Sequence, residues 1–174
     1  AITGAGGGLG AAMARGLASR GARLALLDFR PDALEELKLE LALPQDDCLA
    51  LACDVSKEDE VDRVFEEIAG YFGGLDVLIN NAGITRDALM LKFKDGKRLS
   101  RMSLEAWNAV INVNLTGVFL CGRAAAEQMI LAGDGGLFIN ISSISRAGNM
   151  CQINYYDDNG VVCAKTVIWA TKCA

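Results

Sequence analysis

The stretch TGAGGGLG, residues 3–10, follows a short apolar run and precedes a helical pattern. Glycines at such a point let the backbone turn sharply and approach a pyrophosphate, which the free N–H groups and dipole of the helix N-terminus stabilise. The stretch has no lysine followed by a serine or threonine, so it is not a phosphate loop of the Walker type. A glycine-rich turn without a ligand is the alternative. The residues expected to line a nucleotide site here are Gly4, Gly7, Gly8, Leu9 and Gly10.

A second mark of nucleotide binding is Asp28, which ends the next apolar run 18 residues after Gly10. An acid at about this spacing accepts hydrogen bonds from the hydroxyls of an adenosine ribose. Its neighbour Phe29 is expected to lie against the same nucleotide. Together with the glycine-rich stretch, this acid predicts a dinucleotide site rather than a ligand-free turn.

Strand and helix patterns alternate along the rest of the chain. Short apolar runs predict strands near 1–3, 23–28, 48–55, 75–83 and 136–143. Helical patterns cover 9–20, 31–42, 57–71, a pair within about 103–131, and 153 onward, with Ser56 and Asp59 as a capping pair for the third helix. This alternation predicts a doubly wound α/β fold, a parallel sheet between two helical layers in a Rossmann-type three-layer αβα arrangement. We expect a single domain over residues 1–174, truncated at both ends and incomplete at the C-terminus, because both ends interrupt a pattern.

The composition narrows the class of protein. The 174 residues are 52% hydrophobic, with 19 glycines and two prolines, as expected of one α/β domain with many tight turns. A net charge of −5 argues against nucleic-acid binding. The sequence shows neither an apolar run of membrane-spanning length nor a signal peptide, so we expect no membrane association and a cytoplasmic protein. With no histidine and no C-x-x-C pair among six cysteines, we expect reduced thiols and no metal site.

One segment, residues 84–102, interrupts the alternation of strands and helices. It carries five basic residues and one aspartate within LKFKDGKRLSR. In an acidic protein this is a local positive patch, which could contact a phosphopantetheine, a coenzyme A phosphate or an acidic carrier protein. A solvated surface loop is the alternative.

Several motifs in a fixed order resemble those of one family, the short-chain dehydrogenases/reductases. The motifs are TGAGGGLG at 3–10, CDV at 53–55, NNAG at 80–83, NVNLTG at 112–117, NISS at 140–143 and CQINY at 151–155. The segment NNAGITRDALM is most similar to the corresponding segment of the 3-oxoacyl-acyl-carrier-protein reductases and their 3-hydroxyacyl dehydrogenase relatives. The resemblance implies a carbonyl substrate linked to an acyl carrier or to coenzyme A, and a homo-tetramer or homo-dimer.

The resemblance also implies which residues contact the cofactor. Asp54 and Val55 would lie at the edge of the adenine, and Asn81, Ala82 and Gly83 would line the dinucleotide. NAD is expected over NADP, because a 2′-phosphate beside Asp28 would meet carboxylate repulsion. Arg30 lies two residues later and weakens that preference.

For catalysis the resemblance implies three polar side chains. Asn114 would distort its helix and hold a water of a proton relay, and Ser143 would hydrogen-bond the substrate carbonyl. Tyr155 would contact the cofactor and donate a proton as hydride addition builds negative charge on the carbonyl oxygen.

The position that activates this tyrosine departs from the family pattern. The family has a lysine four residues after the tyrosine, whereas this chain has Asn159. A neutral amide does not lower a tyrosine pKa through charge, and Asp157 and Asp158 would raise it. Three explanations stay open: a weak or inactive nucleotide-binding pseudoenzyme, a substitution that traps a complex, or wrong residue identities beyond about residue 150.

Overall fold

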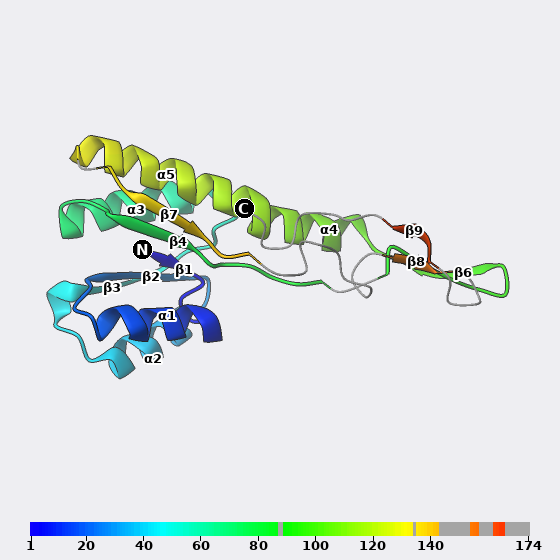
Figure 1. Ribbon diagram of the computed structural model, residues 1–174, viewed down its shortest axis with the longest axis horizontal. Helices are drawn as coiled ribbons and strands as arrows, with labels where there is room; N and C mark the ends of the chain where they lie inside the picture. The colour runs from blue at the N-terminus through cyan, green and yellow to red at the C-terminus, as the bar shows by residue number, and fades with distance from the viewer. Residues whose placement is uncertain (87–88, 134, 143–153, 157–161, 166–174) are drawn as a thin grey trace.

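The computed structural model of the chain describes residues 1–86, 89–133, 135–142, 154–156 and 162–165 (Figure 1). The first elements are β1 (Ile2–Thr3), α1 (Gly8–Ala18), β2 (Leu24–Asp28), α2 (Pro31–Leu41), a 3-10 turn (Gln45–Asp47), β3 (Cys48–Ala52), α3 (Glu58–Phe72) and β4 (Val77–Asn80). They are followed by β5 (Leu91–Lys94), β6 (Lys97–Arg101), α4 (Leu104–Ile111), the π-helical η2 (Asn112–Thr116), α5 (Gly117–Ala132), β7 (Leu137–Asn140), β8 (Asn154–Tyr156) and β9 (Val162–Lys165).

The central sheet has five parallel strands in the order β3-β2-β1-β4-β7. The chain winds outward from β1 to β3, then returns to the other side of β1 with β4 and β7. This confirms the predicted doubly wound fold and all five predicted strands. The two neighbours of β1 therefore lead away in opposite directions, which opens a crevice at the carboxyl ends of β1 and β4.

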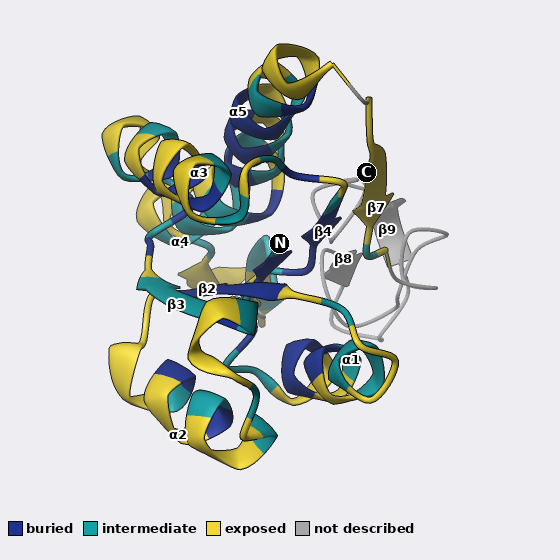
Figure 2. Ribbon diagram, turned by 90° about the vertical axis from the view of Figure 1, so that its left-hand side faces the viewer, coloured by how far each residue is buried: buried dark blue, intermediate teal, exposed yellow. Residues whose placement is uncertain are grey.

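Two helical layers cover the sheet (Figure 2). On one face α3 and α5 bury Phe65, Ile68 and Leu120 against Leu27 and Leu78 of the sheet. On the other face, side chains of α1 and α2 pack on Ile2, Leu26 and Ile79. Because both faces are covered, every residue of β2 is buried, and a continuous apolar run is the sequence pattern that such a strand needs.

The pair of helices predicted within 103–131 is one continuous helical stretch, Leu104–Ala132, in which η2 joins α4 to α5. Among the described residues, this 29-residue stretch has the length and composition of a membrane-spanning helix, which the sequence analysis did not find. One side of α5 contributes to the core through Leu120, Cys121 and Met129. Core helices of soluble proteins can have the same length and composition, so this finding is weak evidence for a membrane span.

The polar segment before α4 contains an antiparallel β-hairpin, β5–β6, where the sequence analysis placed no strand. Its turn is Asp95–Gly96, with φ values of 50° and 69°. Positive φ at both central residues is the type I′ geometry that matches the twist of paired strands, and Asp-Gly is a preferred pair for it. The Asp-Gly pair between alternating residues was the overlooked signal.

The helix predicted from residue 153 onward is wrong for the residues described there. Asn154–Tyr156 form β8, which pairs with β5 in parallel and with β9 antiparallel. β8, β9 and the hairpin make a second sheet in the order β6-β5-β8-β9. The local signal is that aromatic and β-branched residues on both sides of an Asn-Gly pair favour a hairpin, whereas the prediction rested on a helical pattern from residue 153 onward.

The predicted capping pair of α3 is also wrong. Lys57 is the N-cap residue, and its side chain makes no capping hydrogen bond. The hydroxyl of Ser56 instead donates to Oδ1 of Asp54 at 2.7 Å, and its N–H donates to the same oxygen at 3.0 Å. The acids in the first turn, Glu58, Asp59 and Glu60, supply the favourable interaction with the helix dipole.

Candidate dinucleotide site

The glycine-rich stretch forms the turn between β1 and α1, with Gly7 as the N-cap of α1. The N–H of Gly7 donates to the carbonyl of Gly4 at 3.2 Å, and the N–H of Ala11 donates to the carbonyl of Gly7 at 2.7 Å. A Cβ on Gly10 would overlap the carbonyl oxygen of Gly4, whereas a Cβ on Gly8 would meet no atom within 4 Å. The turn is therefore tight on its inner side and open beside the first helical residue.

Asp28 stands at the carboxyl end of β2, with 5% of its surface exposed. Its Oδ2 accepts from the N–H of Gly6 at 3.0 Å. Its Oδ1 accepts from the N–H of Arg30 at 3.1 Å and pairs with Arg30 Nε at 3.3 Å. The carboxylate is thus fixed against the glycine-rich turn, and Asp28 lines the cavity at this edge of the sheet.

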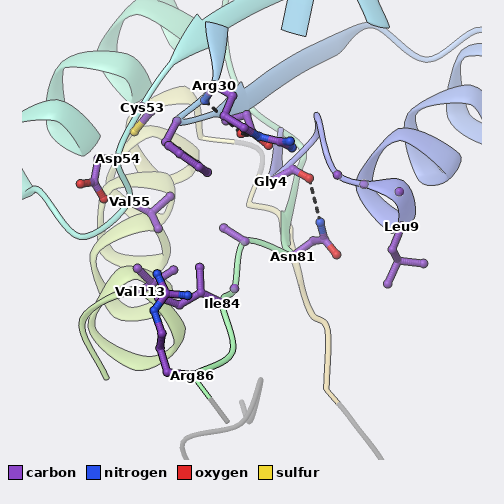
Figure 3. A pocket seen from close by; sticks show the side chains of 17 residues that line it. Gly4, Leu9, Arg30, Cys53, Asp54, Val55, Asn81, Ile84, Arg86 and Val113 are labelled. Atoms are coloured by element: carbon purple, nitrogen blue, oxygen red, sulfur yellow. Dashed lines mark hydrogen bonds and ion pairs between the residues drawn. The ribbon is translucent and has the colours of Figure 1, made fainter. Parts of the chain in front are cut away.

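Asn81 and Thr3 hold the turn against the end of β4. The Thr3 hydroxyl oxygen accepts from the N–H groups of Asn81 and Ala82, each at 3.0 Å. The Nδ2 of Asn81 donates to the carbonyls of Thr3 and Gly4, each at 3.1 Å (Figure 3). Among the described residues, the buried Oδ1 of Asn81 has no hydrogen-bond partner, so it is an acceptor suited to a ligand donor.

Asn114 lies in η2 with 4% of its surface exposed. Its Oδ1 accepts from the N–H of Ile84 at 2.8 Å, and its Nδ2 donates to the carbonyl of Ile84 at 2.9 Å. One amide side chain therefore ties the segment after β4 to the long helix. The helix is locally wound as a π-helix at this residue, as the family resemblance implied, and such π segments often mark functional positions.

These features surround a cavity of about 380 Å³ at the carboxyl edge of the sheet (Figure 3). Twelve predicted cofactor residues line it: Gly4, Gly7, Gly8, Leu9, Gly10, Asp28, Phe29, Asp54, Val55, Asn81, Ala82 and Gly83. The sequence analysis did not assign Cys53, Ile84, Arg86 and Val113 to the cavity, and considered Arg30 only as a modifier. Cys53 and Val113 lie within the CDV and NVNLTG motifs, and Ile84 and Arg86 closely follow NNAG, which was the available signal.

The wall of the cavity combines charged and apolar groups. Asp28 and Asp54 bring carboxylates, and Arg30 and Arg86 bring guanidinium groups. Burial, with a smaller contribution from the charge of Glu60, raises the pKa of Cys53 to about 12. That thiol is therefore neutral at physiological pH and contributes apolar surface rather than a thiolate nucleophile.

The predicted catalytic residues are brought together only in part. Asn114 reaches Ile84, which lines the cavity. Ser143 and Asn159 lie outside the described residues, and Tyr155 is in strand β8 rather than on a helix. The roles of Ser143, Tyr155 and Asn159 therefore stay predictions.

The described residues fit a dinucleotide. The helix N-terminus and the open space at Gly8 suit a pyrophosphate, the Asp28 carboxylate suits ribose hydroxyls, and Asn81 offers a buried acceptor. A parallel sheet with its crevice at the β1/β4 switch point, together with this set, defines a dinucleotide-binding α/β protein.

The chain belongs to the short-chain dehydrogenase family, whose model matches residues 1–156. It is 39% identical over 156 residues to a 3-oxoacyl-[acyl-carrier-protein] reductase of Synechocystis sp., covering 88% of this chain and 59% of that protein. It is 35% identical over 174 residues to such a reductase of Thermotoga maritima, covering 99% of this chain and 67% of that protein. The chain thus spans about three fifths to two thirds of these relatives.

Solved structures share the fold. A short-chain type dehydrogenase/reductase from Mycobacterium marinum superposes with a TM-score of 0.77 at 35% identity, over 87% of this chain and 58% of that one. The structure of an NAD⁺-bound xylitol dehydrogenase gives a TM-score of 0.75 at 28% identity, over 87% and 55% of the two chains.

Proposed function

We propose that the protein is an NAD(H)-dependent oxidoreductase that interconverts a 3-oxoacyl substrate and its 3-hydroxyacyl alcohol. The observation that carries the proposal is the single cavity lined by the glycine-rich turn, Asp28 and the NNAG residues. The relatives named as 3-oxoacyl-[acyl-carrier-protein] reductases support the substrate class. A substrate linked to an acyl carrier or to coenzyme A, fatty-acid metabolism and a cytoplasmic location belong to the same proposal.

When bound, the nicotinamide supplies or accepts the hydride. The chain's own residues do the rest. The N-terminus of α1 holds the pyrophosphate, and Asp28 accepts from the adenosine ribose, while Asp54 and Val55 border the adenine. Asn114 fixes the segment at Ile84 and supports a water of the proton relay.

At the substrate, a proton donor must meet the oxygen on which negative charge develops. We assign this role to Tyr155, with Ser143 as a second donor to the same oxygen, from the family motif. An unperturbed tyrosine has a pKa near 10, so a nearby cation is needed for efficient proton transfer at neutral pH. The chain offers Asn159 at the motif position, and this residue supports the second candidate function, a nucleotide-binding pseudoenzyme.

The test uses the full-length protein, NADH and acetoacetyl-N-acetylcysteamine, with NADH absorbance as the readout. Turnover that Tyr155→Phe abolishes and Tyr156→Phe spares supports the enzyme. If the protein binds NADH but does not turn over, the pseudoenzyme is the better description. A gain of turnover in Asn159→Lys would then identify the missing lysine as the cause, whereas a rate that stays at zero would show that Tyr155 is not the acid.

The long helix suggests the oligomeric state. Leu104, Phe119, Ile130 and Leu131 on α4 and α5 are each more than half exposed. Apolar side chains gathered on one long helix are typical of a surface that a second subunit covers. We therefore infer a homo-dimer or homo-tetramer in which the α4–α5 helix contacts its copy.

A further inference from the structure

We propose that the β5–β6 hairpin is the docking surface for the acidic face of an acyl carrier protein. This rests on the proposed function, since it names the macromolecule that would deliver the substrate. The hairpin projects from the end of the domain toward which β4 runs, which is the edge that carries the cavity (Figure 1). Arg86, on the segment that leads from β4 to the hairpin, lines that cavity.

The hairpin concentrates positive charge in an acidic chain. Residues 91–101 hold five of the chain's 17 basic residues and one of its 22 acidic residues. These cations are Lys92, Lys94, Lys97, Arg98 and Arg101. A field of this kind attracts an anionic partner and orients it before contact.

Several cations of the α/β body pair with carboxylates, whereas the described residues provide no such partner for the cations of the hairpin. Arg15, Arg63 and Arg123 each pair with a carboxylate, at 2.6, 3.3 and 2.7 Å respectively. Across the portion of the chain that the structure describes, no ion pair involves a hairpin cation. Within the described ranges, the positive charge of the hairpin is therefore not neutralised by a carboxylate.

The register places like charges side by side. Lys94 stands directly opposite Lys97, and Lys92 opposite Ser100 on the same face. Like charges directly across a ladder destabilise a hairpin, so this arrangement costs stability that a polyanionic partner would return. The Asp95–Gly96 turn fixes the register and thus the spacing of the cations.

The spacing and the apolar content favour a protein partner. Same-face neighbours on a strand lie roughly 6.6 Å apart, close to the roughly 6 Å that separates acidic residues one helical turn apart. Leu99 sits at the bulge with 55% of its surface exposed, which suits a protein contact better than a phosphate. The other 21 acidic residues would repel a nucleic-acid backbone that extended past the hairpin.

The test compares two full-length double variants. Lys94→Gln/Lys97→Gln removes two hairpin charges. Arg20→Gln/Arg63→Gln removes two exposed charges, one from the turn after α1 and one from α3, as the matched control. Binding of purified holo acyl carrier protein is measured by fluorescence anisotropy at 50 and 200 mM salt. The hairpin variant should bind roughly tenfold more weakly at low salt, with a shallower salt dependence, while the control stays within about twofold.

Three results would overturn the docking proposal: wild type that does not bind the carrier, a hairpin variant that binds as tightly as wild type, or an equal loss in the control. Tighter binding of a single-stranded oligonucleotide or of coenzyme A than of the carrier would also overturn it. Turnover of carrier-linked and N-acetylcysteamine-linked acetoacetate gives a separate readout. The hairpin variant should raise KM only for the carrier-linked substrate. If neither substrate is reduced, the proposed function fails, whereas carrier binding still decides the docking surface.

Discussion

Gly8 and Gly10 lie close together at the glycine-rich turn, but only Gly10 is packed too tightly to accept a side chain. A Cβ on Gly10 would overlap backbone of Gly4 and approach the Cα of Ala5 to 2.9 Å, and neither can move without opening the turn. Gly10→Ala should therefore cost roughly 3 kcal/mol of unfolding free energy. Gly8→Ala should gain about 0.5 kcal/mol, because its Cβ meets no atom and alanine favours the helix.

Although Gly8→Ala should stabilise the fold, it should weaken cofactor binding. Its Cβ would occupy space beside the helix N-terminus where we place the pyrophosphate, so Gly8→Ala should weaken NADH binding severalfold in a more stable protein. Urea denaturation and NADH fluorescence titration give the two numbers. Gly8→Ala with unchanged NADH affinity would contradict the placement of the pyrophosphate.

We expect Asp28 and Arg30 together to set the choice between NAD and NADP. The carboxylate would repel a 2′-phosphate, and no basic residue stands in the glycine-rich turn to offset it. Arg30 pairs with Asp28, and its guanidinium lies over the ring of Phe29 at 5.7 Å, so its positive charge is already partly neutralised. NADH should bind about tenfold more tightly than NADPH, and Asp28→Ser should narrow that ratio. Equal or tighter NADPH binding to the wild type would contradict this assignment.

Among the elements, the layer of α3 and α5 buries two thiols that the site chemistry does not use. Cys53 follows β3 and Cys121 lies on α5, within one core cluster. Burial raises the pKa of Cys53 to about 12 and raises that of Cys121 as well. Each thiol therefore keeps its proton in the folded state at a pH where the unfolded chain, with an ordinary pKa of 9.0, has lost it.

The sign of the pH dependence follows. Below about pH 9 both states hold the proton, and the stability contributed by a neutral buried thiol is fully present. From pH 9 towards 12 the unfolded state releases protons that the folded state retains, so unfolding free energy should fall by up to about 1.4 kcal/mol per pH unit per thiol. Urea midpoints from pH 8 to 11 measure this slope.

Two variants separate the thiol from its packing. Cys53→Ala should be less stable than wild type at neutral pH but should lose less stability as the pH rises. Val61→Ala removes buried volume from the same cluster without a titrating group, so its slope should match that of wild type. An unchanged slope in Cys53→Ala would mean that another group causes the alkaline loss.

Elements were predictable from the sequence where one local pattern and the fold agreed. β2 and α3 are such cases, because a buried strand needs a continuous apolar run and an exposed helix needs one apolar face. The β5–β6 hairpin was missed because its segment has the composition of a polar loop, and β8 because residues from 153 onward were assigned to a helical pattern. The same holds for the site residues. The glycine-rich turn and Asp28 are marked by local sequence patterns, whereas the tertiary fold brings Arg86 and Val113 to the cavity.

At the scale of the whole molecule, α4 and α5 present apolar side chains that the described part of the chain does not cover. Phe119 is 61% exposed and has the guanidinium of Arg123 over its ring at 5.7 Å. Leu39 on α2, in the opposite helical layer, is 78% exposed and serves as a comparison. If α4–α5 is the contact between subunits, a charge at residue 119 must be buried without a partner across the interface.

Full-length wild type should therefore sediment as a dimer or tetramer at micromolar concentration, and Phe119→Asp should shift it to a smaller species. Leu39→Asp adds the same charge at a more exposed apolar position and should leave the sedimentation coefficient unchanged. Both substitutions replace exposed side chains, so near-native thermal midpoints are expected and would show that folding is intact. A monomeric wild type, or dissociation of both variants alike, would show that α4–α5 is not the contact and that its apolar residues are covered by another part of the protein.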